Sequence, residues 1–128
     1  MAFNERERSM ISVTKIRHKP NPHGCSVFEM YYIMGKFDTE DRVFLLSYDE
    51  ASKLFKDDGD RTAGPTDYAV SQGCPRYSSG NYVWALRTRG MDTPLVSGVF
   101  STGSFDFYIW SYQYTGIRPA VWIELPEK

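Results

Sequence analysis

Phe105-Asp106-Phe107-Tyr108-Ile109-Trp110-Ser111-Tyr112 is the stretch of this 128-residue chain that says most about its fold. In a β-strand, successive side chains point to opposite faces of the sheet. One face would carry the apolar residues Phe105, Phe107 and Ile109. The other would carry one acidic and three aromatic residues, Asp106, Tyr108, Trp110 and Tyr112. The first face suits a core, whereas the second combines large apolar area with polar tips, which suits either a ligand or a covering segment.

The segments around this stretch also have the pattern of strands. They are Tyr82–Arg87, Leu95–Phe100 and Ala120–Leu125. Between two of them, Gly103 in Ser101–Ser104 can adopt the positive φ that a tight hairpin requires. This pattern predicts that the last third of the chain forms an antiparallel β-meander.

Helix signals lie earlier in the chain. Ser47 and Glu50 have the spacing of a capping box and precede an apolar pattern of helical period, which predicts a helix over 48–56. Asn4 and Glu7 have the same spacing and predict a short first helix. Weaker patterns predict strands over 12–17, 27–34 and 43–46, the last covered on both faces, and a helical turn over 65–69. Residues 19–24, 35–41, 56–60 and 71–80 are expected to form loops and turns. Helices in the first part of the chain and a β-meander in the last third together predict one α+β domain over residues 1–128.

Composition argues against several classes of partner. Fifteen Lys and Arg against sixteen Asp and Glu give a net charge of -1, so no basic field favours nucleic acid or an anionic membrane. No segment approaches the roughly 20 apolar residues of a membrane span, and no signal-sequence pattern follows Met1. We therefore expect no nucleic-acid partner and no membrane span. As given, the chain would be cytoplasmic, whereas a longer parent chain would allow the cell surface.

Metal-binding and nucleophilic residues are sparse. Cys25 and Cys74 are too few for a disulfide framework, which leaves two unpaired thiols or a single disulfide. His18, His23 and Cys25 share one loop but lack a fourth zinc ligand, and the acidic run 57–60 lacks the spacing of a calcium loop. We expect no metal and no cofactor.

Several segments together resemble one bacterial family, the domain of unknown function 6273. In chain order they are Ala2-Phe3-Asn4, Asp41–Ser47, Glu50–Phe55, Pro65–Ala69, Trp84–Arg87 and Gly116–Ile123. The resemblance implies a protein of gut-dwelling Gram-positive bacteria and, more distantly, the C-type-lectin-like fold shared with formylglycine-generating enzymes. Family members usually start earlier, with a Trp-Leu-Asn signature. The resemblance thus implies a truncated domain whose uncovered face self-association would bury, giving a homo-oligomer.

Arg87 and Arg118 lie in the two segments most similar to that family. A planar guanidinium there would bind a carboxylate, phosphate or sugar, or it would act as an internal clamp on backbone carbonyls and aromatic rings. Trp84 and Trp122 flank these positions and favour the clamp. Gly116 would supply a turn before Arg118.

The leading functional hypothesis is a non-catalytic binding or interaction domain with a glycan or protein ligand. Its ligand-binding residues would be Tyr108, Trp110, Tyr112, Tyr114, Trp84, Arg87 and Arg118. A packing role is expected for other aromatic residues, namely Phe44, Phe55, Phe105, Phe107 and Trp122. Two alternatives stay open: an enzyme that uses Cys74 or the arginine pair on a small anionic substrate, and a structural module of a larger surface protein.

Overall fold

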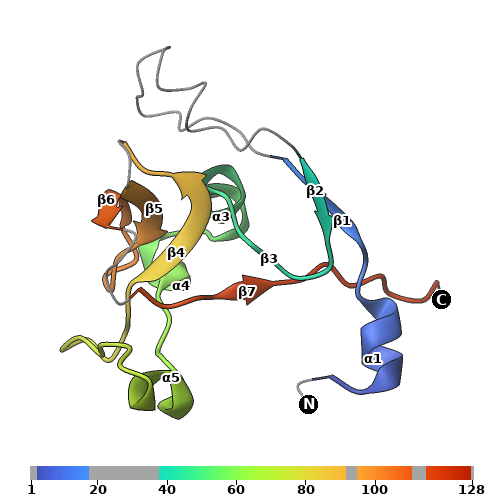
Figure 1. The fold of residues 1–128 in the computed structure, drawn as a ribbon, viewed down its shortest axis with the longest axis horizontal. Helices are drawn as coiled ribbons and strands as arrows, with labels where there is room; N and C mark the ends of the chain where they lie inside the picture. Colours follow the sequence, from blue (N-terminus) through green and yellow to red (C-terminus); the bar gives the residue numbers. More distant parts are fainter. Residues whose placement is uncertain (1–2, 18–37, 92–94, 111–114, 128) are drawn as a thin grey trace.

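The computed structural model of the chain describes residues 3–17, 38–91, 95–110 and 115–127 (Figure 1). Short helices and antiparallel strands alternate along it, which confirms the α+β class. In chain order the elements are α1 (Glu5–Met10), β1 (Thr14–Ile16), β2 (Thr39–Asp41), β3 (Phe44–Leu45), α3 (Tyr48–Leu54), α4 (Asp58–Arg61), α5 (Asp67–Ser71), β4 (Trp84–Arg89), β5 (Leu95–Val99), β6 (Phe105–Trp110) and β7 (Pro119–Ala120).

The strands form one three-stranded sheet and two strand pairs. The sheet has the order β4-β5-β6 and is antiparallel throughout, so the predicted meander is confirmed. β7 does not extend this sheet. It pairs instead with β3, Phe44 opposite Ala120, and beyond it Ile123 makes an isolated bridge to Ile11. The predicted strand over 120–125 is therefore wrong in length, because β3 offers β7 only two residues before α3 begins.

Side-chain caps define where the helices begin. Asn4 with Glu7 and Ser47 with Glu50 both form complete capping boxes, as predicted. α3 ends at Leu54 because Phe55 already has an extended backbone. Thr66 caps α5 by accepting from the N–H of Ala69, so the predicted turn over 65–69 forms two residues further along.

Two segments expected to be turns are regular elements. Residues 39–41, within a stretch that looked turn-like, form β2 against β1, with Lys15 opposite Glu40. Residues 58–61, expected to be a solvated turn, form helix α4, capped by the Asp57 carboxylate. In both cases a partner distant in sequence decides the structure. The predicted strand over 27–34 lies outside the described part of the chain.

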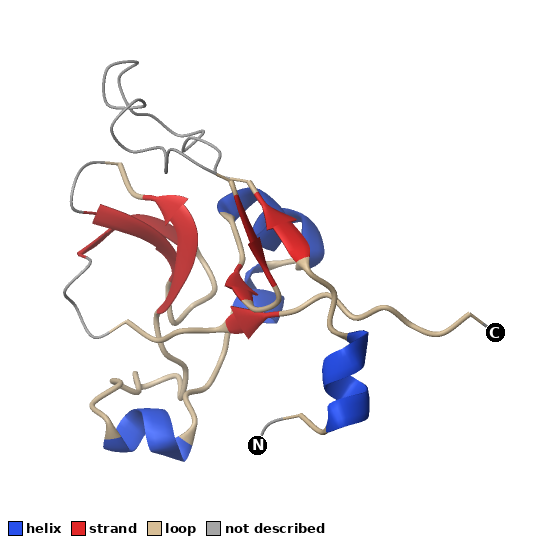
Figure 2. Cartoon of the chain, turned by 45° about the vertical axis from the view of Figure 1, so that its right-hand side comes forward, coloured by secondary structure: helices blue, strands red, loops and turns tan. Residues whose placement is uncertain are grey.

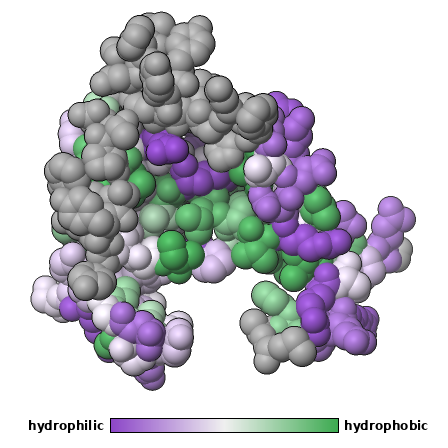
Figure 3. Space-filling view, viewed as in Figure 1, coloured by the Kyte–Doolittle hydropathy of each residue, from purple (hydrophilic) through white to green (hydrophobic). Residues whose placement is uncertain are grey.

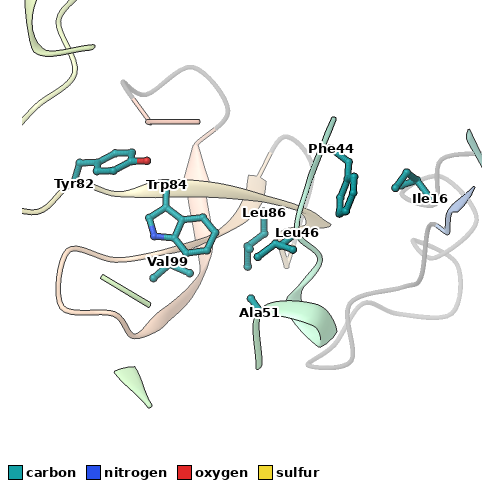
Figure 4. Packing of buried hydrophobic residues seen from close by; sticks show 8 residues of the cluster. All are labelled: Ile16, Phe44, Leu46, Ala51, Tyr82, Trp84, Leu86 and Val99. Atoms are coloured by element: carbon teal, nitrogen blue, oxygen red, sulfur yellow. The ribbon is translucent and has the colours of Figure 1, made fainter. Parts of the chain in front are cut away.

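The core lies between the three-stranded sheet and α3. Trp84 is at its centre with none of its surface exposed, next to Val99 on β5 (Figure 4). Leu86 and Leu46 continue this cluster toward Phe44 and Ile16. Figure 2 shows the sheet on one side of the two strand pairs, and α1 and α5 projecting on the same side of the molecule. A hollow lies between these two helices, with hydrophobic side chains gathered above it (Figure 3).

A β-bulge in β6 changes which side chains share a face. Asp106 pairs with Gly98 and Ile109 with Val96, so Phe107 and Tyr108 lie opposite the single residue Ser97. A Cβ at Gly98 would collide with Ile109 Cδ1, which places Ile109 on the face of Gly98 and Asp106. The strict alternation expected for 105–112 is thus wrong after Phe107.

An ion pair ties β4 to α3. Arg87 Nη2 donates to Glu50 Oε1 at 2.8 Å, Nη1 donates to the other carboxylate oxygen, and Nη1 also donates to the carbonyl of Leu45 at 2.8 Å. Burial alone would raise the pKa of Glu50, but hydrogen bonds from Arg87 and from the Ser47 backbone outweigh it and lower that pKa. The charged form of Glu50 therefore contributes to stability.

The contribution of Glu50 to stability should depend on pH with a defined sign. Because its pKa is lower in the folded chain than in the unfolded chain, its contribution is present above about pH 4.5 and is lost as pH falls through the folded pKa. We expect Glu50→Gln to cost roughly 1–2 kcal/mol at neutral pH and to flatten the decrease of unfolding free energy in acid. Urea denaturation at pH 7, 5 and 3 measures both effects. Glu40 is exposed, so Glu40→Gln is the control. If the free energy of unfolding decreased as steeply in acid for Glu50→Gln as for the wild type, this assignment would be contradicted.

Position 103 requires glycine for two reasons, its backbone conformation and a close contact. It has φ +89°, and a Cβ there would collide with the backbone carbonyl of Asp58. Gly80 has φ +81°, but the space that a Cβ would occupy there is open. We expect Gly80→Ala to cost about 1 kcal/mol through the left-handed backbone alone, and Gly103→Ala to cost at least twice as much, measured by thermal unfolding. Equal losses would show that the contact with Asp58 is not needed.

Candidate functional site

Arg118 acts as a clamp inside the domain. Its guanidinium carbon lies 5.0 Å from the ring centroids of both Phe55 and Trp84. Nη1 donates to the carbonyl of Arg61 at 3.0 Å, and Trp84 Nε1 donates to the same carbonyl, also at 3.0 Å. Trp122 takes no part in this cluster and is 48% exposed, so the expectation that it packs in the core is wrong.

Both arginines have partners of the kind that the clamp interpretation expects. Arg87 is held by Glu50 and the carbonyl of Leu45, and Arg118 by two rings and a carbonyl. Trp84, which was also predicted to bind ligand, is completely buried, whereas the two arginines are half-buried. All three have contacts with other residues of the domain, and their role in ligand binding stays a prediction.

The aromatic face predicted on β6 is described only at Tyr108, which is 63% exposed. Within the bulge, the backbone N–H of Tyr108 donates to Asp106 Oδ1 at 2.9 Å. Trp110 ends β6 opposite Leu95. The side chain of Trp110 and all of Tyr112 and Tyr114 lie outside the residues that the structure describes.

A pocket of about 290 Å³ lies between α5 and the segment after β6. Its walls come from the loop before α5, from α5 itself and from residues 115–117. The lining residues are Gly64, Pro65, Thr66, Ala69, Gln72, Cys74, Tyr82, Thr115, Gly116 and Ile117. Its volume is at the lower end of the range for small-molecule sites.

Gly116 sets the shape of this pocket. It bridges in parallel to Trp84, and a Cβ at Gly116 would collide with the ring of Tyr82. Its hydrogen atom therefore allows the chain to pass over the aromatic ring, and the turn that the sequence predicted there is replaced by an extended bridge. The Tyr82 hydroxyl donates to the carbonyl of Ile117 at 3.5 Å, which is the limit of a hydrogen bond.

The chemistry of the pocket is polar but uncharged. Burial raises the pKa of Tyr82, with Arg118 acting in the opposite direction, so the hydroxyl stays protonated as a donor at neutral pH. Cys74 is a half-buried free thiol whose Sγ lies 3.9 Å from the carbonyl of Pro75. Asp, Glu, Lys and Arg are all missing from the lining residues. Sequence reasoning missed this pocket because its residues carry no motif of known chemistry.

The acidic residues considered as metal ligands have other roles in the structure. Asp57 caps α4 and Asp58 pairs with Arg61. Within the described ranges no three His, Cys, Asp or Glu side chains gather as metal ligands would. His18, His23 and Cys25 fall outside those ranges. No helix in the described part of the chain has the length and apolar character to cross a membrane.

Comparison with known proteins gives one finding. The family described as "Domain of unknown function (DUF6273)" matches residues 1–125. No curated protein and no solved structure matches the chain.

The bulge in β6 predicts opposite effects for two adjacent residues. Tyr108 is 63% exposed, so Tyr108→Ala should change the free energy of unfolding by no more than about 0.5 kcal/mol. Ile109 is 4% exposed and lies against Gly98, so Ile109→Ala should cost about 2–4 kcal/mol. Chemical denaturation of both variants checks this, and a large loss in Tyr108→Ala would place that ring in the core.

Proposed function

This chain belongs to the DUF6273 family, and we propose that it is a non-catalytic binding domain that holds a neutral, hydroxyl-bearing ligand, such as a sugar residue of a glycan, in the pocket beside α5. The observation that carries the proposal is the lining of that pocket. Hydroxyl and amide groups stand among apolar walls, and none of the described side chains that line the pocket is charged.

The available donors and acceptors fit such a ligand. Tyr82 offers a protonated hydroxyl whose bond to the Ile117 carbonyl is long enough to be exchanged for a ligand oxygen. Gln72 and Thr115 add an amide and a hydroxyl, which both donate and accept. Pro65, Ala69 and Ile117 supply apolar surface, which the C–H faces of a sugar ring also offer. An anionic substrate would find no cation among these residues.

The position of the arginines supports binding over catalysis of an anionic substrate. Arg87 and Arg118, which an enzyme of that kind would use, are engaged by Glu50, by backbone carbonyls and by aromatic rings. Moving either of them toward a substrate would break contacts of the core. We therefore favour the binding domain over the enzyme.

The proposal includes a second contact surface and a fold type. Tyr108 is exposed on β6, and with Trp110, Tyr112 and Tyr114 it would provide aromatic contacts for a longer glycan or a protein. The α+β content and the order of the meander support a C-type-lectin-like architecture, which we propose for the domain as a whole.

Cys74 provides a direct test because it lines the pocket. In a Cys25→Ser background, the rate of iodoacetamide alkylation reports on Cys74 alone. A neutral monosaccharide such as galactose or N-acetylglucosamine, at ten times its Kd, should slow this rate about tenfold by occupying the pocket. Glucuronate, which carries a carboxylate, should protect less. Protection by glucuronate alone, or by none of a panel of neutral sugars, would contradict the proposal.

A matched pair of variants separates the pocket from the rest of α5. Ala69 lines the pocket, whereas Val70 is the next residue along the helix and is 39% exposed. Ala69→Leu should fill the space and abolish protection by the sugar, and Val70→Leu should leave protection unchanged. Circular dichroism should show that both variants are folded. Equal protection in both would place the ligand elsewhere.

A further inference from the structure

We infer that an apolar recess beside α1 is a second binding site, whose ligand is a carboxylate carried on an alkyl chain, as in a medium-chain fatty acid. The recess has a volume of about 530 Å³ and is lined by Phe3, Arg8, Ser9, Ile11, Arg42 and Val43. It lies at α1, and α5 projects on the opposite side of the hollow (Figure 3).

The walls of the recess are fixed by hydrogen bonds. Arg42 Nη1 donates to the carbonyl of Ile11 and so joins the end of α1 to the turn before β3. On the other side, the N–H of Glu124 donates to the carbonyl of Met10, and that of Ser12 to the carbonyl of Trp122, both at 2.9 Å. The recess is therefore preformed, which lowers the cost of ordering it around a ligand.

The interior of the recess is apolar and open to solvent. Ile11 is buried to 6% exposure, whereas Phe3 and Val43 keep 39% and 56% of their surface exposed. The sequence predicted that 43–46 would be covered on both faces, and the exposure of Val43 corrects this. Hydrophobic side chains that gather in one hollow, rather than lying singly on a surface, mark a site for an apolar group.

The charged groups of the recess have one sign. Arg8 and Arg42 line it, and none of the described residues that line it carries a carboxylate. The nearest acidic side chains in sequence are directed elsewhere, because Glu7 accepts from the N–H of Asn4 and Asp41 accepts from the hydroxyl of Thr39. Two guanidinium groups therefore stand beside apolar surface in a chain whose net charge is -1.

This combination selects the class of ligand. A guanidinium recognises a carboxylate through paired, charge-assisted hydrogen bonds. A small anion would leave the apolar surface of Phe3 and Val43 exposed, and an uncharged alkyl chain would leave both arginines without a counter-charge. A carboxylate attached to an alkyl chain satisfies both parts of the recess at once.

Titration calorimetry with decanoate tests this inference on the full chain. Decanoate should bind, and Arg8→Gln should weaken it about tenfold, since one charge-assisted contact is lost. Arg6→Gln, an exposed arginine of α1 that does not line the recess, should bind as the wild type does. Circular dichroism of Arg8→Gln should be unchanged, since the structure shows its side chain in no hydrogen bond or ion pair among the described residues.

Other ligands distinguish the alternatives. Decanol binding as tightly as decanoate would contradict a role for the carboxylate. Acetate or inorganic phosphate binding as tightly would contradict a role for the alkyl chain. An acidic peptide with apolar residues that bound more tightly than decanoate would make this a peptide site and overturn the inference, as would no binding of decanoate. Alkylation of Cys74 should be unaffected by decanoate, which keeps this test separate from that of the pocket beside α5.

Discussion

Arg61 holds four parts of the chain together, through its backbone carbonyl and its side chain. Its backbone carbonyl accepts hydrogen bonds from Trp84 Nε1 on β4 and from Arg118 Nη1 in the C-terminal segment. The side chain of the same residue donates through Nε to the carbonyl of Gly103 at 2.8 Å, and its guanidinium lies 4.3 Å from the ring centroid of Phe105. Helix α4 has only four residues, so these contacts rather than its own hydrogen bonds keep it formed.

This arrangement explains why charged residues serve packing in this domain. A guanidinium can stack on a ring and donate in its own plane at the same time, which an apolar side chain of equal volume cannot do. Arg61 and Arg118 use both properties, and Arg87 joins β4 to the cap of α3. These three arginines are therefore already engaged within the domain, unlike Arg8 at the recess beside α1.

Local signals in the sequence predicted local structure well. The capping boxes at Asn4 and Ser47, the hairpin glycine at 103 and the order of the meander all depend on residues near one another in the chain. By contrast, β2 and α4 exist because of partners far away in sequence, and the bulge in β6 shifts the alternation by one residue with no signal of its own. The pocket was missed for the same reason, since Tyr82 and Gly116 meet only in the folded chain. Sequence alone also could not separate an arginine that binds a ligand from one that clamps a core, because aromatic neighbours suit both.

The antiparallel contact between residues 10–12 and 122–124 has a mechanical consequence. Both ends of the chain leave this contact on the side of the bond between Met10 and Glu124. Tension applied to the two ends would therefore load that bond first and the bond between Ser12 and Trp122 next, so that they open in succession, as in a zipper. The cluster around Trp84 lies beyond these bonds, so the C-terminal segment would separate from the end of α1 before that cluster is disrupted.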